Sequence, residues 1–153
     1  MDEKPHLRIE LVSHSRYLSC VRECMAQTAR QFGFAEAQSS QIALAVDEAI
    51  ANVIKHGYAD RTDGLIWVSI YPLGDDEIRG TGIKIVIEDE ARQVEPSCIK
   101  GRDLADIRPG GLGVHIIREI MDEVCYEKRA TSGMRLTLCK WTKGRAGSAA
   151  ISA

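Results

Sequence analysis

The stretch from residue 41 to residue 58 places a polar stripe along the edge of an apolar helix, and this feature constrains the chain most. At about 100° per residue, one broad apolar arc forms; it contains Ile42, Ala43, Val46, Ala49, Ile50, Val53 and Ile54. Glu48, Asn52 and His56 follow the edge of this arc at i,i+4 spacing, so neighbouring members can reach one ligand. A solvated edge would instead carry Lys and Glu pairs. We interpret the helix as part of a binding site, with Gly57 as its C-terminal cap.

The composition indicates one globular domain. The chain has 153 residues and a net charge of −2, which favours neither nucleic acid nor an anionic membrane as a partner. No apolar run approaches the roughly 18 residues of a membrane span, and the polar start does not resemble a secretory signal. We therefore predict a cytoplasmic protein. The five scattered cysteines are interpreted as small core hydrophobic residues rather than as zinc ligands or disulfides.

The hydrophobic pattern predicts the order of the elements. Alternation predicts strands at 7–12, 65–71 and 83–88, and two closing strands are predicted at 123–129 and 134–141, joined through Thr131-Ser132-Gly133. A period of 3.6 predicts helices at 18–32, from about 36, and at 114–121. Ser13 or Ser15 can cap the first helix, and the polar region from Gly74 to Gly82 is predicted to connect a hairpin. The predicted fold is α+β, a two-layer sandwich whose mixed, mostly antiparallel sheet is covered by helices on one face. Residues 1–143 form the domain, and 144–153 are predicted to be a disordered tail.

Two further motifs lie later in the chain. Asp89 continues the odd parity of a buried strand, so its carboxylate needs a donor from the protein or from a ligand. Residues 91–110 have no clean period, and a loop of this length in a compact domain is often functional. The loop leads into Gly110-Gly111-Leu112-Gly113 at the start of a helix, where bare N–H groups suit phosphate. No Gly-Lys-Ser/Thr follows, so this is not a Walker loop.

In this order, the three motifs resemble the Bergerat ATP-binding fold of gyrase-type ATPases and histidine kinases. Within that superfamily the chain most resembles the anti-sigma-factor serine/threonine kinases, over about residues 7–141. The resemblance implies ATP and Mg²⁺ as cofactors. It assigns Asn52 as the Mg²⁺ ligand and Glu48 as the general base for the attacking hydroxyl. His56 would be a positioning residue at the helix end, and Asp89 would accept a hydrogen bond from the adenine amino group.

The same resemblance assigns the phosphate side to the glycine motif. Gly110, Gly111, Leu112 and Gly113 would let the backbone approach the phosphates, and Arg108 or Arg102 would stabilise γ-phosphate charge. The adenine side departs from the family.

On that side, Ala91 and Gln93 replace the usual glycines, and Met134 follows Gly133 where a threonine hydroxyl is common, with Thr137 further along. Ala91 would add a methyl group to the pocket or adopt a strained positive φ. We expect weak ATP binding that Ala91→Gly tightens a few-fold.

The favoured hypothesis is an ATP- and Mg²⁺-dependent serine/threonine protein kinase of the anti-sigma type. By resemblance it would phosphorylate a small anti-sigma-factor antagonist protein, sequester a sigma factor and form a homodimer. The alternative is a nucleotide- or partner-binding regulatory module of the same fold without phosphotransfer. A detached histidine-kinase catalytic domain is disfavoured because the sequence contains no phospho-accepting histidine segment.

Overall fold

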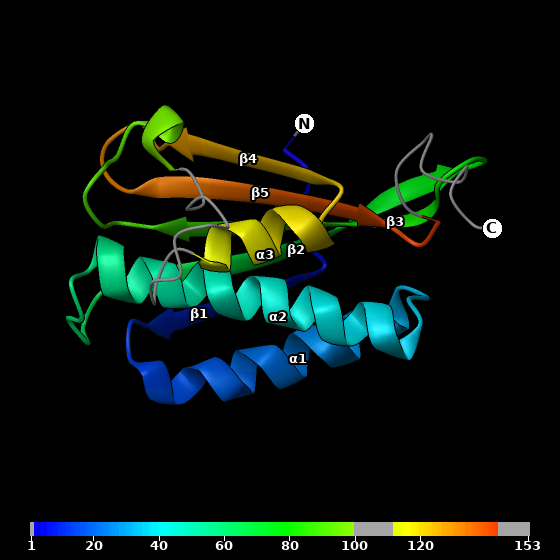
Figure 1. Cartoon of the computed structure of the whole chain (residues 1–153), viewed down its shortest axis with the longest axis horizontal. Helices are drawn as coiled ribbons and strands as arrows, with labels where there is room; N and C mark the ends of the chain where they lie inside the picture. Colours follow the sequence, from blue (N-terminus) through cyan, green and yellow to red (C-terminus); the bar gives the residue numbers. More distant parts are fainter. Residues whose placement is uncertain (1, 100–111, 144–153) are drawn as a thin grey trace.

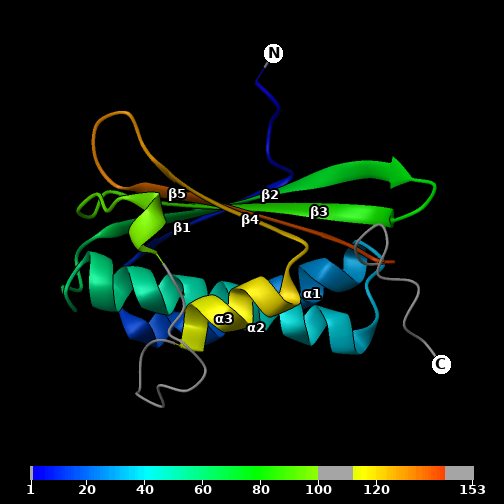
Figure 2. The ribbon, with the colours of Figure 1, turned by 45° about the horizontal axis from the view of Figure 1, so that its top comes forward.

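The computed structural model describes residues 2–99 and 112–143, which form one sheet covered by helices on a single face (Figures 1 and 2). The strands are β1 (Leu7–Val12), β2 (Leu65–Asp76), β3 (Gly80–Asp89), β4 (Glu123–Lys128) and β5 (Met134–Trp141). Their order across the sheet is β1-β2-β3-β5-β4. The helices are α1 (Leu18–Gln31), α2 (Glu36–Asn52) and α3 (Leu112–Ile120). The predicted α+β sandwich is confirmed, and each described strand pair is antiparallel.

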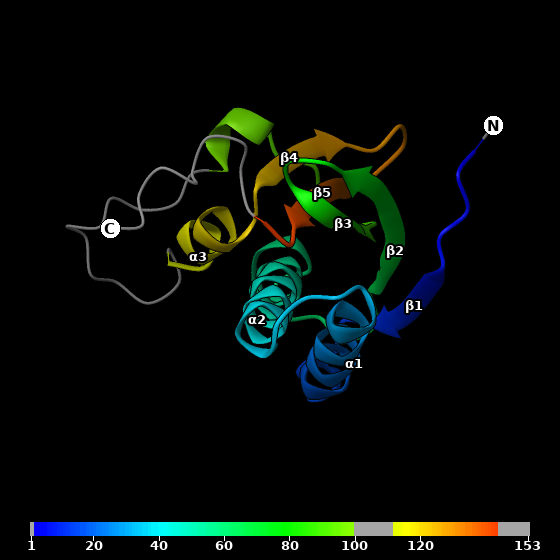
Figure 3. The ribbon, with the colours of Figure 1, turned by 90° about the vertical axis from the view of Figure 1, so that its right-hand side faces the viewer.

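The core lies between the sheet and α2, which runs between α1 and α3 (Figure 3). Alternate residues of the central strands face the helices and are buried; they are Ile66, Val68, Ile70, Ile83, Ile85, Ile87, Leu136 and Leu138. Helix α2 contributes Ile42, Val46 and Ile50, all with no exposed surface. Burial of each such side chain contributes about 1.5–3 kcal/mol. Because α3 packs beside α2, Glu48 and Asn52 of the polar edge lie against α3 and are half-buried, whereas His56 is exposed.

The β2–β3 hairpin is longer than predicted. Most of the segment from Gly74 to Gly82 belongs to the two strands, and the turn comprises only residues 77–79. The Asp76 carboxylate accepts hydrogen bonds from the backbone N–H groups of Ile78 and Arg79, both at 2.8 Å, and closes this turn. The hairpin extends past the helices (Figure 2). Its strands there have no helix to cover, so they lack the apolar alternation that identifies a half-buried strand.

The predicted helix caps are wrong. Neither Ser13 nor Ser15 caps the first helix, since the turn that leads into it (Ser15–Tyr17) is capped by His14, whose side chain accepts from the Arg16 N–H group. Ser13 is fully buried, and its hydroxyl donates to the Arg61 carbonyl and accepts from the Gly64 N–H group, so it joins β1 to the turn before β2. Gly57 is not a left-handed cap either. The chain after Asn52 forms a wide π turn (Val53–Gly57), in which the Tyr58 N–H group donates to the Val53 carbonyl at 2.8 Å. The positive φ angles fall on the next residues, Ala59 and Asp60.

The cysteines do not form the predicted set of core residues. Cys139 is buried and Cys24 is half-buried, whereas Cys20, Cys98 and Cys125 are exposed, and all are free thiols. The exposed ones lie on outward-facing positions of α1 and β4 and in the short 3-10 turn Pro96–Cys98. Within residues 2–99 and 112–143, no helix has the length and apolar character that crossing a bilayer requires.

Candidate functional site

A cavity of about 360 Å³ lies between α2, the end of β3, the start of β5 and the first turn of α3. Most of its wall is apolar; the lining includes Ala49, Val53, Ile87, Val94, Ile99, Val114, Tyr126, Met134 and Leu136. Its polar groups come from Asn52, His56, Asp89 and Arg92. Apolar walls with a few polar groups are typical of small-molecule sites, and the volume lies within their usual range of roughly 300–1,000 Å³. The cavity can therefore accept a small, largely apolar organic group that carries a few polar atoms.

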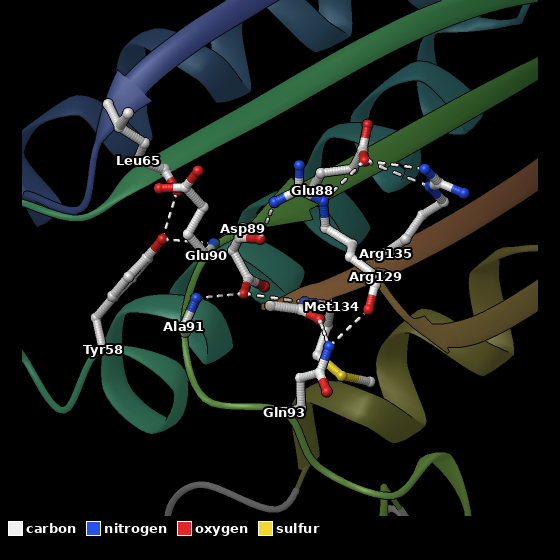
Figure 4. Close-up of polar contacts among 11 residues, drawn as sticks. Tyr58, Leu65, Glu88, Asp89, Glu90, Ala91, Gln93, Arg129, Met134 and Arg135 are labelled. Atoms are coloured by element: carbon white, nitrogen blue, oxygen red, sulfur yellow. Dashed lines mark hydrogen bonds and ion pairs between the residues drawn. The ribbon is translucent and has the colours of Figure 1, made fainter. Parts of the chain in front are cut away.

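Asp89 occupies the end of β3 and is only 4% exposed. Its Oδ1 atom accepts hydrogen bonds from the N–H groups of Ala91 at 2.9 Å and Met134 at 3.2 Å (Figure 4). The Oδ2 atom has no hydrogen bond with any described residue, which leaves one acceptor for a ligand in the cavity. Burial raises the pKa of this carboxyl, although the two N–H groups and Arg129 lower it. A ligand that donates a hydrogen bond to Asp89 would offset part of the free-energy cost of burying its ionised carboxylate.

Three contacts that sequence reasoning missed surround Asp89. The Arg129 guanidinium donates to the Asp89 carbonyl at 2.7 Å and pairs with Glu88 at 3.2 Å. The Gln93 amide donates to the Arg129 carbonyl at 2.7 Å. Gly133 has φ 79°, and any side chain there would overlap the Asp89 carbonyl. These contacts join β3 to the β4–β5 turn. Gly133 was visible as a turn residue, but nothing local in the sequence pointed to its neighbour across the sheet.

Ala91 is buried, and its methyl group packs against Gly57. A Cβ atom added to Gly57 would lie 2.9 Å from the Ala91 Cβ atom. The φ angle of Ala91 is not positive. Of the two predicted effects of Ala91, the strained positive φ is wrong, because the turn after Asp89 does not require a left-handed residue. The methyl group does form part of the cavity wall.

Helix α3 begins directly against the polar edge of α2. A Cβ atom added to Gly113 would lie 2.9 Å from Glu48 Oε2 and 3.3 Å from Asn52 Nδ2. The carboxylate and the amide thus meet at one point of the α3 backbone, which only glycine leaves open. Asn52 and His56 line the cavity, whereas Glu48 does not, and lies beside it toward α3.

The remaining predicted site residues are placed differently. Leu112 begins α3 and is 44% exposed. Thr137 does not line the cavity. Its neighbours Leu136 and Leu138 are buried toward the helices, and alternation along β5 directs Thr137 to the other face of the sheet. Arg102, Arg108, Gly110 and Gly111 lie outside the described residues, as do most of the predicted lid and the tail 144–153.

The donor set fits a magnesium ion that is shared with a ligand. Within residues 2–99 and 112–143, no group of three or more His, Cys, Asp or Glu side chains is arranged to hold a metal. Mg²⁺ is commonly bound by one or two protein oxygens together with substrate phosphates and water. The Asn52 amide oxygen is a protein ligand of this kind, and the Glu48 carboxylate lies against the same residue, Gly113.

Sequence comparison links the chain to one family. The model of the histidine kinase-like ATPase domain matches residues 11–140. The anti-sigma F factor of Clostridium novyi is 28% identical over 141 residues, covering 90% of this chain and 94% of that protein. The serine-protein kinase RsbW of Listeria innocua is 30% identical over 121 residues, which cover 77% of this chain and 76% of that protein. The serine-protein kinase RsbW of Staphylococcus epidermidis is 26% identical over 147 residues, which cover 90% of this chain and 87% of that protein.

Solved structures share the fold. A Mycobacterium tuberculosis protein with RsbU and RsbW domains superposes with a TM-score of 0.61 and 19% identity over 88% of this chain. A blue-light-activated histidine kinase of Erythrobacter litoralis superposes with a TM-score of 0.53 and 17% identity over 84%. The matched region spans 32% and 42% of those longer chains.

Proposed function

We propose a function from the premise that this chain belongs to the histidine kinase-like ATPase domain family and, within it, to the anti-sigma-factor serine/threonine kinases. The proposed activity is transfer of the γ-phosphoryl group of ATP to a serine or threonine of a small antagonist protein. The observation that carries this proposal is the meeting of Glu48 and Asn52 at Gly113. It puts a carboxylate and an amide oxygen beside a cavity whose other end holds a buried acceptor, Asp89.

The proposed orientation of ATP follows from the polarity of the cavity. The adenine ring would occupy its apolar part, with the 6-amino group donating to Asp89 Oδ2. The phosphates would extend toward Asn52 and the N-terminus of α3, where N–H groups and the helix dipole favour negative charge. Because Gly113 lacks a side chain, its backbone lies close to Glu48 and Asn52, so the N-terminus of α3 is beside both groups. Gly110, Gly111 and Arg108 would complete this end of the site.

The proposed chemistry needs little beyond positioning and charge neutralisation. Mg²⁺, held by Asn52 and the phosphates, would neutralise charge on the phosphate oxygens. Glu48 accepts the proton of the acceptor hydroxyl while the bond from that oxygen to the γ-phosphorus forms. The bond from the γ-phosphorus to the β–γ bridging oxygen breaks, and ADP leaves. His56, which is exposed on the π turn and lines the cavity, would be a positioning residue at the end of α2.

The partners are proposed from the family. A sigma factor and its antagonist protein are the expected partners, because the relatives are named anti-sigma F factor and serine-protein kinase RsbW. We further propose a homodimer that works in the cytoplasm, where such partners would act.

Transfer of radiolabelled phosphate from ATP tests the proposed function. The purified chain is incubated with labelled ATP, Mg²⁺ and a candidate antagonist protein. Acid-stable phosphate should appear on the antagonist. Glu48→Gln should lower this rate by about 10²–10⁴-fold, since general bases contribute that much. Glu23→Gln, an exposed carboxylate on α1, is the matched control and should leave the rate unchanged.

Two outcomes would contradict the proposal. ATP binding without transfer would identify a regulatory binding module of the same fold. Acid-labile phosphate would indicate histidine chemistry instead.

A further inference from the structure

The Tyr58 hydroxyl stands between β2 and β3 at the point where their pairing stops (Figure 4). The last paired residues are Ile66 and Asp89, so Leu65 and Glu90 would form the next pair. Instead, the hydroxyl donates to the Leu65 carbonyl at 2.6 Å and accepts from the Glu90 N–H group at 2.8 Å. A phenol oxygen can do both at once, whereas phenylalanine can do neither. Tyr58 therefore replaces a direct contact between the strands with a bridged one.

The position of Tyr58 is itself tightly held. The residue is 5% exposed, and a side chain at Gly64 would overlap its ring. Its N–H group closes the π turn that carries His56 and Gly57. The hydroxyl consequently connects the end of α2, which carries Asn52, to the end of β3, which carries Asp89.

The bridge coincides with a change in the direction of the chain. After Asp89, the backbone does not continue along β2, and the Ala91 N–H group turns back to Asp89 Oδ1, the pattern of an Asx turn. On the opposite side, Met134 donates to the same oxygen, and Arg129 holds the Asp89 carbonyl. Asp89 is thus fixed from the β5 side by Met134 and Arg129, and from the β2 side by Tyr58 through Glu90.

We propose that Tyr58 is a positioning residue for base selectivity: its hydroxyl holds β2 and β3 apart at Glu90 and so directs the free oxygen of Asp89 at the 6-amino group of adenine. This inference rests on the proposed function, because it requires adenine in the cavity. Without the hydroxyl, Glu90 can approach the Leu65 carbonyl directly, and the turn that presents Asp89 shifts toward the sheet.

Inosine triphosphate (ITP) distinguishes this role from simple stabilisation of the fold. ITP carries a carbonyl oxygen where ATP carries the 6-amino group, and that oxygen would face the Asp89 carboxylate. The ratio of the dissociation constants of MgITP and MgATP therefore measures the contact between Asp89 and the base. Tripolyphosphate with Mg²⁺ has no base and measures the phosphate side alone. A loss of general stability would not change the ratio in a folded protein.

The experiment compares the wild-type chain, Tyr58→Phe and the control Tyr71→Phe by calorimetry at a temperature where circular dichroism shows each to be folded. Tyr71 lies on the same strand as Leu65 and, by alternation with the buried Ile70, faces the side of the sheet away from the helices. There the Lys84 ammonium lies 4.5 Å from the centre of its ring. We expect the wild type and Tyr71→Phe to prefer ATP by about 10–100-fold, as for a hydrogen bond to a charged group. Tyr58→Phe should prefer it by less than about threefold, with tripolyphosphate binding unchanged.

The outcomes separate the two proposals. If Tyr58→Phe has the same ratio of MgITP to MgATP dissociation constants as the wild type, the positioning role is wrong. A wild-type protein that binds ATP and ITP equally overturns the placement of adenine at Asp89, whatever Tyr58 does. If Tyr58→Phe does not fold, Glu90→Pro replaces it, because proline lacks the N–H group that donates to the Tyr58 hydroxyl while the Tyr58 ring is kept. This variant should lower the ratio of the MgITP and MgATP dissociation constants in the same way. An unchanged ratio in Glu90→Pro also overturns the positioning role.

Discussion

The methyl group of Ala91 fills the space beside Gly57, where a Cβ atom would stand only 2.9 Å away. The two residues come from the end of the α2 segment and from the turn after β3, so this contact helps to define the distance between two walls of the cavity. A methyl group can be accommodated on one side of the contact but not on both.

This contact predicts strong coupling between the two positions. Gly57→Ala should lower the free energy of unfolding by about 1–3 kcal/mol, the usual cost of overpacking. Ala91→Gly should lower it by about 0.5–1 kcal/mol through added backbone freedom. The double variant, which moves the methyl group across the contact, should lose less than the sum. Urea unfolding measures all four proteins, and strictly additive losses would show that the residues do not touch. Calorimetry on Ala91→Gly also tests the expected few-fold gain in ATP affinity.

Asp89→Asn should separate stability from binding. Burial raises the pKa of Asp89, so the native state binds this proton more tightly than the unfolded state does. The stabilisation from the proton is fully present below the unfolded pKa of about 3.9 and is lost as pH rises through the native pKa. Asparagine removes the ionisation, and its Oδ1 atom can still accept from Ala91 and Met134. The difference in unfolding free energy between Asp89→Asn and wild type should therefore increase from pH 4 to pH 7. The increase corresponds to the free-energy cost of ionising the buried Asp89 carboxyl, which only the wild type bears.

The same variant should bind MgATP about 10–100-fold more weakly, because an acceptor for the adenine amino group is lost. Denaturation at the two pH values and calorimetry at pH 7 make the comparison. Unchanged affinity for ATP would remove Asp89 from the site, and a relative stability that falls with pH would contradict the proposed effect of its burial.

Gly113→Ala should reduce phosphotransfer while it preserves the fold. The new methyl group would lie 2.9 Å from Glu48 Oε2 and 3.3 Å from Asn52 Nδ2, so both side chains must move. Alanine favours the helix by about 1 kcal/mol over glycine, which offsets the crowding in the unfolding free energy. We expect a rate at least about tenfold lower, since small displacements of catalytic groups are costly. Gly74→Ala, with open space around the new methyl group, is the control. Full activity in Gly113→Ala would show that Glu48 and Asn52 need not meet there.

Asn52→Ala should remove the dependence of ATP binding on magnesium. The wild type should bind ATP more tightly with Mg²⁺ than with EDTA, because the amide oxygen supplies a protein ligand. The variant should show nearly equal affinities in the two conditions. Gln41→Ala removes an exposed amide from the same helix and should behave as wild type. A variant that binds MgATP as tightly as wild type would exclude Asn52 as a ligand.

The sequence by itself determined the elements and their faces. Alternation predicted β1 and the first part of β2, and the arc of Ile42, Val46 and Ile50 predicted the buried side of α2, because hydrophobic periodicity is a local property. The polar edge of α2 was visible for the same reason: Glu48 and Asn52 are one turn apart in any helix. The strand parity of Asp89 likewise predicted burial, which its 4% exposure confirms.

The tertiary structure decided which groups meet. Asp89 is held by Met134, which is 45 residues away in sequence, and Glu90 by Tyr58, which is 32 away. The direction of the Ala91 methyl group, the meeting of Gly113 with Glu48, and the opposite-face position of Thr137 depend on strand register and helix packing. No local pattern encodes these contacts, because hydrogen bonds and close approaches act over a few ångströms in space, and the chain brings their partners together only when the sheet and helices pack.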